Sequence, residues 1–324
     1  MDFGLTDEQE QLAEAERAWL ALHDPLARVR TALDAAPITI DAAAVAHTEE
    51  SGLLDLLTPE MGGTHVDLAV LTEAHGHAAS SLPIADLAVA AWLLSIAGMD
   101  DGGDRLIGLT VAEDDAGTPV PMAADLDAIA VVRQDGANEY LSVLTTPTLV
   151  TMSTLDLTRS WARIDLDAIG TAATELPAGT LAAARDALAV HRAFDALGAA
   201  SRLLDMTVEY AGQREQFGAP IGSFQAVKHH CADMVVAVEA GRAALWAGAL
   251  ALDTVIGADR SRAASAAAAY AKSAAARVAG NALQVHGGIG FTWEHDLHLL
   301  LRRIKVDEAF NGAVADHRAA LVSG

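Results

Sequence analysis

From Gly179 onward the chain is rich in alanine, and glycine and proline are scarce except in two short segments, Phe217–Gly222 and Gly287–Gly290. Alanine is the best intrinsic helix former because it loses no side-chain entropy on folding, whereas closely spaced glycine and proline end helices. This pattern predicts helices over residues 180–212, 222–256 and 259–285 and a shorter pair within 295–322. Helices of this length, joined by short loops, pack as an antiparallel bundle.

The first hundred residues show a second helical pattern. Thr6 is a suitable N-cap, and the acids that follow it complement the positive end of a helix dipole. Pro59–Gly63 and Leu82–Pro83 interrupt the pattern, because proline and paired glycine are costly inside a helix. A helical domain over residues 1–100 is therefore expected.

Residues 101–178 favour strands instead. Glycine, aspartate and asparagine separate three short β-favouring runs, Leu106–Val111, Ala128–Val132 and Tyr140–Leu144. The expected fold is mainly α, with an N-terminal helical domain (1–100), a shortened β domain (101–178) and a C-terminal helical bundle that mediates oligomerisation (179–324).

Composition excludes several classes of function. The formal net charge of −23 opposes binding to nucleic acid or to anionic lipid, since both are negatively charged. Cys231 is the single cysteine, so the chain can form neither an internal disulfide nor a cysteine-rich metal site, and no H-E-x-x-H spacing indicates a metal. The first residues lack a secretory-signal pattern, and the apolar runs are short or interrupted by charge. We expect a cytoplasmic protein with no membrane partner.

The two loops between the predicted helices carry residues that suit an anionic ligand. The first reads R-E-Q-F-G-A-P-I-G-S-F-Q from Arg214 to Gln225, and an arginine at a helix end presents a forked donor for a pyrophosphate. The second reads Q-V-H-G-G-I-G from Gln284 to Gly290, and glycines let the backbone approach an anion. Taken singly, each loop also has a structural interpretation, as an arginine helix cap or as a glycine C-cap.

Together, the sequences of the two loops and the distance between them along the chain resemble those of the acyl-CoA dehydrogenase family. Members of that family read R-x-x-F-G-x-x-I/L-x-x-x-Q, A-D/E-M, Q-x-x-G-G-x-G and R-R/D-x-K, and the matching segments begin here at Arg214, Ala232, Gln284 and Arg302. The resemblance covers residues 179–312 and, less closely, residues 1–83.

The resemblance implies an FAD cofactor that is shared across a subunit contact. In the family both loops reach the FAD of the neighbouring subunit, and the first arginine binds the pyrophosphate. The residues of this chain that the resemblance assigns to FAD are Arg214, Phe217, Phe224, Gln225, Gln284, Gly287 and Gly288.

The residue at the usual position of the catalytic base departs from the family. The family removes the α proton of an acyl-CoA with a carboxylate, which in most members is the Glu of a Y-E-G-T stretch. Here that stretch reads F-N-G-A, and the amide of Asn311 takes no proton at physiological pH. A second family position falls at the apolar Leu188. The catalytic residue is therefore unknown, with Asp307 and Glu308 as candidates that also fit an ordinary salt-bridged helix face.

Other parts of a self-contained site are missing as well. The family's D-x-x-R reads here as Asp186 followed by Ala189, and Ala313–Ala315 replace its T-x-Q. The T-E-P-x-x-G-S-D and W-I/V-T/S-N segments that cradle the flavin ring do not occur between Pro83 and Gly179.

The resemblance and these departures predict a degenerate subunit that pairs with a fuller homologous subunit in a heteromeric, α2β2 acyl-CoA dehydrogenase. Such assemblies occur in bacteria that degrade steroid side chains, which implies a steroid acyl-CoA substrate and an external electron acceptor. One alternative is a homo-oligomeric dehydrogenase with Asp307 or Glu308 as base. Another is a flavin-free paralogue that only scaffolds a partner.

Overall fold

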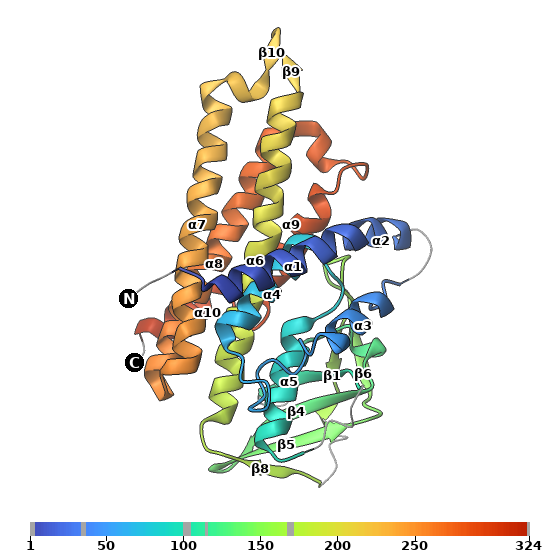
Figure 1. Ribbon diagram of the computed structural model, residues 1–324, viewed down its shortest axis with the longest axis vertical. Coiled ribbons are helices and arrows are strands. Elements are labelled where there is room, and N and C mark those ends of the chain that lie inside the picture. The colour runs from blue at the N-terminus through green and yellow to red at the C-terminus, as the bar shows by residue number, and fades with distance from the viewer. Residues whose placement is uncertain (1–3, 34–36, 100–104, 114–115, 167–171, 323–324) are drawn as a thin grey trace.

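The computed structural model describes residues 4–33, 37–99, 105–113, 116–166 and 172–322. An antiparallel bundle of long helices forms its spine (Figure 1). The bundle helices are α6 (Thr180–Gln213), α7 (Gln225–Thr254), α8 (Gly257–His286), α9 (Leu297–Ala309) and α10 (Val314–Val322). The helices predicted from the alanine-rich sequence are confirmed. By length and composition α7 could also cross a membrane, but here it packs against α6 and α8.

The N-terminal part is helical as predicted. Its helices are α1 (Asp7–His23), α2 (Pro25–Ala32), α3 (Ala42–Glu50), α4 (His65–Ala78) and α5 (Ile84–Ile96). Thr6 caps α1, because its Oγ1 accepts from the Gln9 backbone N–H while Gln9 Oε1 accepts from the Thr6 N–H. The predicted breaks are confirmed, since α4 begins after the Pro59–Gly63 segment and α5 begins directly after Pro83.

The β region contains more strands than the sequence pattern predicted. The three predicted runs lie in β1 (Ile107–Glu113), β4 (Ala128–Asp135) and β5 (Asn138–Leu144). The additional strands are β2 (Ala116–Gly117), β3 (Val120–Pro121), β6 (Leu149–Met152), β7 (Trp161–Ile164) and β8 (Thr174–Leu176). Within the described residues, the strands of this region form two sheets, in the orders β2-β1-β4-β5-β8 and β3-β7-β6, and only the β1–β4 pairing is parallel. The additional strands are short and depend on long-range pairing.

One apolar core joins the sheet to the helices. It includes Leu93 of α5, Leu109 of β1, Val132 of β4 and Leu188 of α6, all of which are buried. Burial of such side chains contributes about 1.5–3 kcal/mol each. The N-terminal half of α6 is therefore held between the sheet and the bundle.

A close helix crossing fixes α4 against α6. A Cβ atom at Gly198 of α6 would lie 2.2 Å from the carbonyl oxygen of Glu73, and one at Gly76 of α4 would lie 2.2 Å from the carbonyl oxygen of Asp195. Both obstacles are backbone atoms, which cannot move aside as a flexible side chain could. The crossing therefore requires glycine on both helices, and it brings Asp195 directly against α4.

Replacing the crossing glycine should destabilise the protein. We predict that Gly198→Ala lowers the free energy of unfolding by about 1–3 kcal/mol, because the added methyl forces the helices apart. The matched control is Gly280→Ala on α8, where a Cβ meets nothing within 4 Å. That change should stabilise the protein by about 0.5–1 kcal/mol through helix propensity. Urea unfolding of both variants gives the comparison, and an equal effect at the two sites would contradict the close crossing.

Candidate functional site

The structure brings the two glycine-containing loops to the same end of the bundle. The first loop joins α6 to α7 through a hairpin of β9 (Glu215–Gln216) and β10 (Ala219–Pro220), which projects beyond the rest of the molecule (Figure 1). The second loop, η4 (Gly287–Phe291), follows α8. The rings of Tyr210 and His286, at the ends of α6 and α8, stack with centroids 4.5 Å apart. All seven residues predicted to bind FAD therefore lie on these loops or on the adjoining helix turns.

The projecting hairpin presents an arginine and an aromatic ring to the outside. The Arg214 backbone is held by hydrogen bonds to Tyr210 (2.8 Å) and from Ile221 (2.7 Å). The Arg214 guanidinium is exposed, and within the described part of the chain it has no ion pair or hydrogen bond. An arginine cap would need side-chain bonds to helix carbonyls, so this structural interpretation finds no support. The Arg214 side chain remains free to bind an anion.

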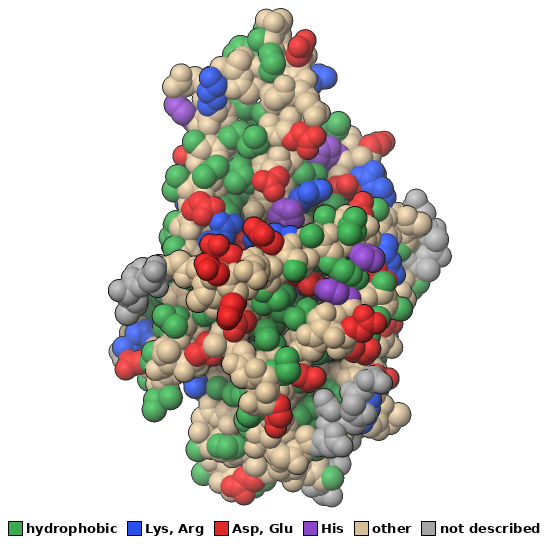
Figure 2. All heavy atoms as spheres, viewed as in Figure 1, with side chains coloured by type: hydrophobic (Ala, Val, Ile, Leu, Met, Phe, Trp, Pro, Cys, Tyr) green, Lys and Arg blue, Asp and Glu red, His purple; other side chains and the backbone are tan. Residues whose placement is uncertain are grey.

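The aromatic residues of this loop are exposed as well. Phe217 is 96% exposed, and its ring meets that of Phe224 edge to face at 6.1 Å. Phe217 also has a positive φ of 53°, which is a strained conformation for a non-glycine residue. Figure 2 shows hydrophobic side chains at this projecting end of the molecule. The two exposed rings offer an apolar surface for contact with another molecule.

The second loop is open to approach. Gly287 ends α8 with a φ of 60°, and a Cβ at Gly287 or Gly288 would meet nothing within 4 Å. Gln284 is exposed on the last turn of α8. Gln225, at the start of α7, is also exposed, and its side chain contacts the ring of His229 (3.2 Å). The geometry thus allows a ligand to lie against this end.

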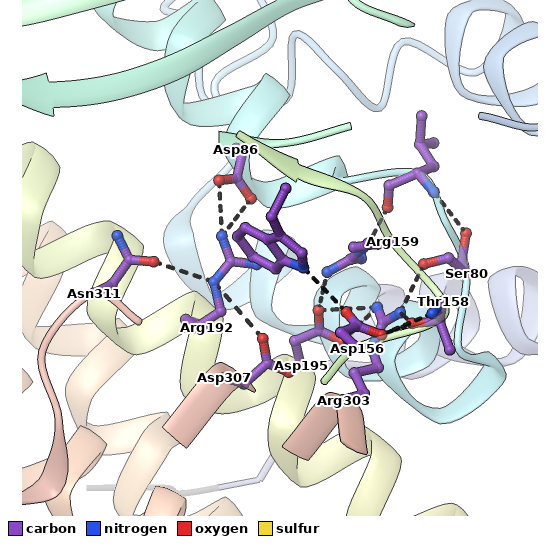
Figure 3. A network of polar contacts seen from close by, with 12 residues as sticks. Ser80, Asp86, Asp156, Thr158, Arg159, Arg192, Asp195, Arg303, Asp307 and Asn311 are labelled. Atoms are coloured by element: carbon purple, nitrogen blue, oxygen red, sulfur yellow. Dashed lines mark hydrogen bonds and ion pairs between the residues drawn. The ribbon is translucent and has the colours of Figure 1, made fainter. Parts of the chain in front are cut away.

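The usual base position has a different environment, half-buried beside an internal polar network (Figure 3). Asn311 lies in the turn between α9 and α10, and its Oδ1 accepts a hydrogen bond from Arg192 Nε (3.2 Å). Arg192 is buried and forms an ion pair with Asp86 of α5 (2.8 Å). The Arg192 guanidinium also lies over the Trp161 ring, and that ring meets Phe310 edge to face. One side of Asn311 therefore faces a packed cluster of this chain's own side chains.

Lys272 of α8 holds the turn that contains Asn311. Its buried ammonium donates to the carbonyl oxygens of Phe310 (2.7 Å) and Gly312 (2.6 Å). Burial lowers the pKa of Lys272 to about 7. Asn311 adopts a positive φ of 54° in this turn, so the lysine fixes a strained conformation.

A second buried carboxylate, Asp195, is bound by two arginines (Figure 3). Arg303 of α9 donates to it through Nε (3.0 Å) and Nη2 (2.8 Å), and Arg159 donates through Nη1. Burial alone would raise the pKa of Asp195, but Arg159, Arg303 and Arg192 together lower it to about 2. Asp195 is therefore a structural anion and a poor base.

The two carboxylates proposed as replacement bases lie in opposite environments. Asp307 is fully buried and points toward Arg192, whose Nε is 3.9 Å away (Figure 3). Neither of its oxygens has a hydrogen-bond partner among the described residues, and burial together with Asp195 raises its pKa to about 8. Glu308 faces outward and accepts from Lys305 (2.8 Å). One candidate is inaccessible and the other is salt-bridged at the surface.

The remaining family positions are also used within the chain. Asp186 accepts from Arg260 Nε (2.9 Å) and from Ser261 Oγ (2.8 Å), which ties α6 to the first turn of α8. Leu188 is buried and borders a cavity of about 10 Å³. Such a cavity can hold one water molecule but no acyl chain.

The sequence reasoning missed Arg192, Asp86 and Trp161. The available signal was an arginine in a mostly apolar, alanine-rich stretch of α6, three residues beyond Ala189. Such a residue requires a buried partner, but the pattern does not show which one.

Asp307 gives a pH-dependent prediction for stability. Its pKa is raised in the folded protein from the ordinary 3.8 to about 8, so the stability associated with the protonated form is complete below pH 4 and is lost as pH rises through 8. Asp307→Asn cannot ionise, so its stability relative to the native chain should increase between pH 4 and 8. Urea unfolding over this range tests the trend, with the exposed Asp233→Asn as control. A constant difference between Asp307→Asn and the native chain would refute it.

Comparisons with known proteins agree with this geometry. Residues 180–322 match the family described as acyl-CoA dehydrogenase, C-terminal domain. Acyl-CoA dehydrogenase IpdE2 of Mycobacterium tuberculosis is 32% identical over 308 residues, which cover 92% of this chain and 91% of that protein.

Two solved structures share the fold over almost the whole chain. The ChsE4-ChsE5 complex from Mycobacterium tuberculosis gives a TM-score of 0.85 at 22% identity, and the Tcur3481-Tcur3483 steroid ACAD G363A variant gives 0.83 at 23% identity. Each match covers 98% of this chain and 97% of the other. With IpdE2 similar over nearly its full length, this chain belongs to the acyl-CoA dehydrogenase family.

Proposed function

We propose that this chain is one subunit of a heteromeric acyl-CoA dehydrogenase and contributes half of an FAD site to a fuller homologous subunit, in an α2β2 assembly. The observation that carries the proposal is a contrast within one chain. Arg214 and Phe217 are exposed on the projecting hairpin, and the Arg214 guanidinium has no partner among the described residues, whereas half-buried Asn311, at the base position, accepts from buried Arg192. Two of the similar structures are named as complexes of two different chains, which supports a mixed assembly.

The projecting end suits the phosphate-containing half of FAD. Arg214 would hold the pyrophosphate, because its forked donors have no other partner among the described residues. Phe217, Phe224 and Gln225 would lie along the cofactor, and Gln284, Gly287 and Gly288 would close over it with little steric hindrance. When bound, FAD supplies the acceptor for the hydride that leaves the acyl group.

The interior does not suit the ring of the flavin or the acyl group on this chain. The cavity beside Leu188 is about 10 Å³, and Arg192, which donates to Asn311, is itself packed against Asp86 and Trp161. The ring pocket and the base would therefore come from the partner subunit. The substrate would be an acyl-CoA, and the name of one similar structure, a steroid ACAD, favours a steroid side-chain thioester. An external acceptor would reoxidise the flavin.

The structure weighs against a self-sufficient enzyme. Asp307 is fully buried and so lacks the access to a substrate proton that a general base needs, and Glu308 is paired with Lys305 at the surface. An experiment distinguishes the other alternative, a flavin-free scaffold, from a shared flavin site. The chain is purified alone and after co-expression with a homologue encoded beside it, and the absorbance of bound flavin is measured. Colour only in the mixture supports the shared site. Stoichiometric flavin with turnover in the isolated chain, or no flavin in the mixture, would overturn it.

Arg214→Ala should weaken flavin binding in the assembled complex. The variant removes a charge-assisted contact with the pyrophosphate, worth about 1.5–3 kcal/mol, which is roughly a 10- to 150-fold loss of affinity. Flavin titration of the apo complex measures the loss. The control is Arg318→Ala on α10, an exposed arginine at the other end of the bundle (Figure 1). If both variants retain native affinity, Arg214 has no part in binding.

Asn311→Glu should not by itself create an active homomeric dehydrogenase. The new carboxylate would stand where the amide now accepts from Arg192, and the adjacent guanidinium would lower its pKa and weaken it as a base. The cavity beside Leu188 would also still be too small for the thioester, at about 10 Å³, and base and positioning act together. Turnover of the isolated variant is assayed with a panel of acyl-CoAs and an artificial electron acceptor. Rates well above those of the native chain would show that a complete site was already present.

A further inference from the structure

Three buried nitrogens belong to side chains that border one small cavity where α4, α5 and α6 meet. The cavity has a volume of about 10 Å³, and its lining includes His75 of α4, His191 of α6 and Arg159 before β7. These residues are 1%, 1% and 3% exposed. Within the described ranges, no group provides a hydrogen-bond partner for His75 Nδ1, His191 Nδ1 or Arg159 Nε. Buried polar atoms are almost always hydrogen-bonded, so three unpaired atoms on residues that line one cavity point to a shared partner.

For two of these side chains, the hydrogen bonds of the other nitrogens show whether the unpaired nitrogen is a donor or an acceptor. His75 Nε2 lies 2.9 Å from Glu16 Oε1. An ionised carboxylate only accepts, so Nε2 carries a proton, and in the neutral imidazole Nδ1 then presents a lone pair. Arg159 donates to Asp195 through Nη1 and to the Leu82 carbonyl through Nη2 (3.1 Å), which leaves its Nε–H as a donor. The partner in the cavity must therefore both donate and accept.

We propose that this cavity binds one water molecule, which accepts from Arg159 Nε–H and donates to His75 Nδ1 and His191 Nδ1. The volume is that of a single water, and three polar partners are the usual number for a buried one. A halide or other anion is disfavoured because it would face the lone pair of His75. An apolar ligand would leave all three nitrogens unpaired.

The bound water completes a continuous hydrogen-bonded line through four helices. On one side His75 and His47 of α3 both contact the buried carboxylate of Glu16 at 2.9 Å. On the other side His191 Nε2 lies 3.1 Å from Nδ1 of His65, the first residue of α4. If the water donates to His191 Nδ1, then His191 Nε2–H donates to His65. All four histidines then share the Nε2–H tautomer.

This site is independent of flavin binding. The line lies within the chain and uses none of the residues of the projecting loops. If the bound water is disproved, the proposal of a shared FAD site is unaffected. If the shared FAD site is disproved, the proposal of the bound water is unaffected.

The test measures the tautomers and the water directly. The full chain is labelled with 15N-histidine and studied at pH 7, alone or with its co-purified partner. Long-range 1H–15N spectra should show protons on Nε2 of His75 and His191 and hydrogen-bonded lone pairs on both Nδ1 atoms. Exchange peaks should connect the ring protons with water. A crystal structure should show one solvent peak within about 3.2 Å of the three nitrogens.

A variant separates a shared water from two unrelated histidines. His75→Phe removes one acceptor, so the His191 Nδ1 resonance should shift relative to the native chain. His77→Phe is the matched control on the same helix, because His77 pairs with Asp205 at the surface, and it should leave His191 unchanged. A proton on either Nδ1 in the native spectrum, or a crystal structure without density in the cavity, would overturn the proposal even if His75→Phe fails to fold.

Discussion

The buried carboxylate of Asp195 is the point on which the arrangement of the chain depends. Arg303 of α9 and Arg159 before β7 both bind it. The same arginines donate to the carbonyl oxygens of Ser80 and Leu82 in the turn between α4 and α5. Removing one partner of a buried ion pair leaves an uncompensated charge, which costs about 3–5 kcal/mol. Four separate segments are thus held around one anion, and the glycine crossing of α4 and α6 makes this approach possible.

Pairing of buried charged residues with one another also explains why the interior of this chain is better suited to stabilising the fold than to catalysis. Arg192 is bound to Asp86 and Asn311, and Asp186 is bound to Arg260, so these positions are occupied by internal partners. A catalytic group must exchange partners during a reaction, which a fully paired buried ion cannot do without cost. The exposed Arg214 guanidinium differs because it can gain a partner without losing one.

The parts of the fold that could be predicted from the sequence are those set by local preferences. Alanine content and glycine spacing predicted the bundle helices and both loops, and Thr6 predicted the start of α1. β6 and β8 could not be predicted, because strands this short are defined by pairing with distant segments. The Arg192–Asp86 pair joins residues 106 positions apart. The sequence showed that a base was missing at Asn311, but only the tertiary structure shows what fills its surroundings.

A general base must combine access to the substrate with a pKa near the working pH. None of the three acidic residues near the base position is shown to meet both conditions. Asp307 has a raised pKa but no exposure, Glu308 has exposure but pairs with Lys305, and Asp195 has neither. No small side-chain movement supplies both, because Asp307 would have to leave the core and Asp195 would have to leave two arginines. A carboxylate on a second chain avoids this conflict, since it can approach a cofactor that Arg214 holds at the outer surface.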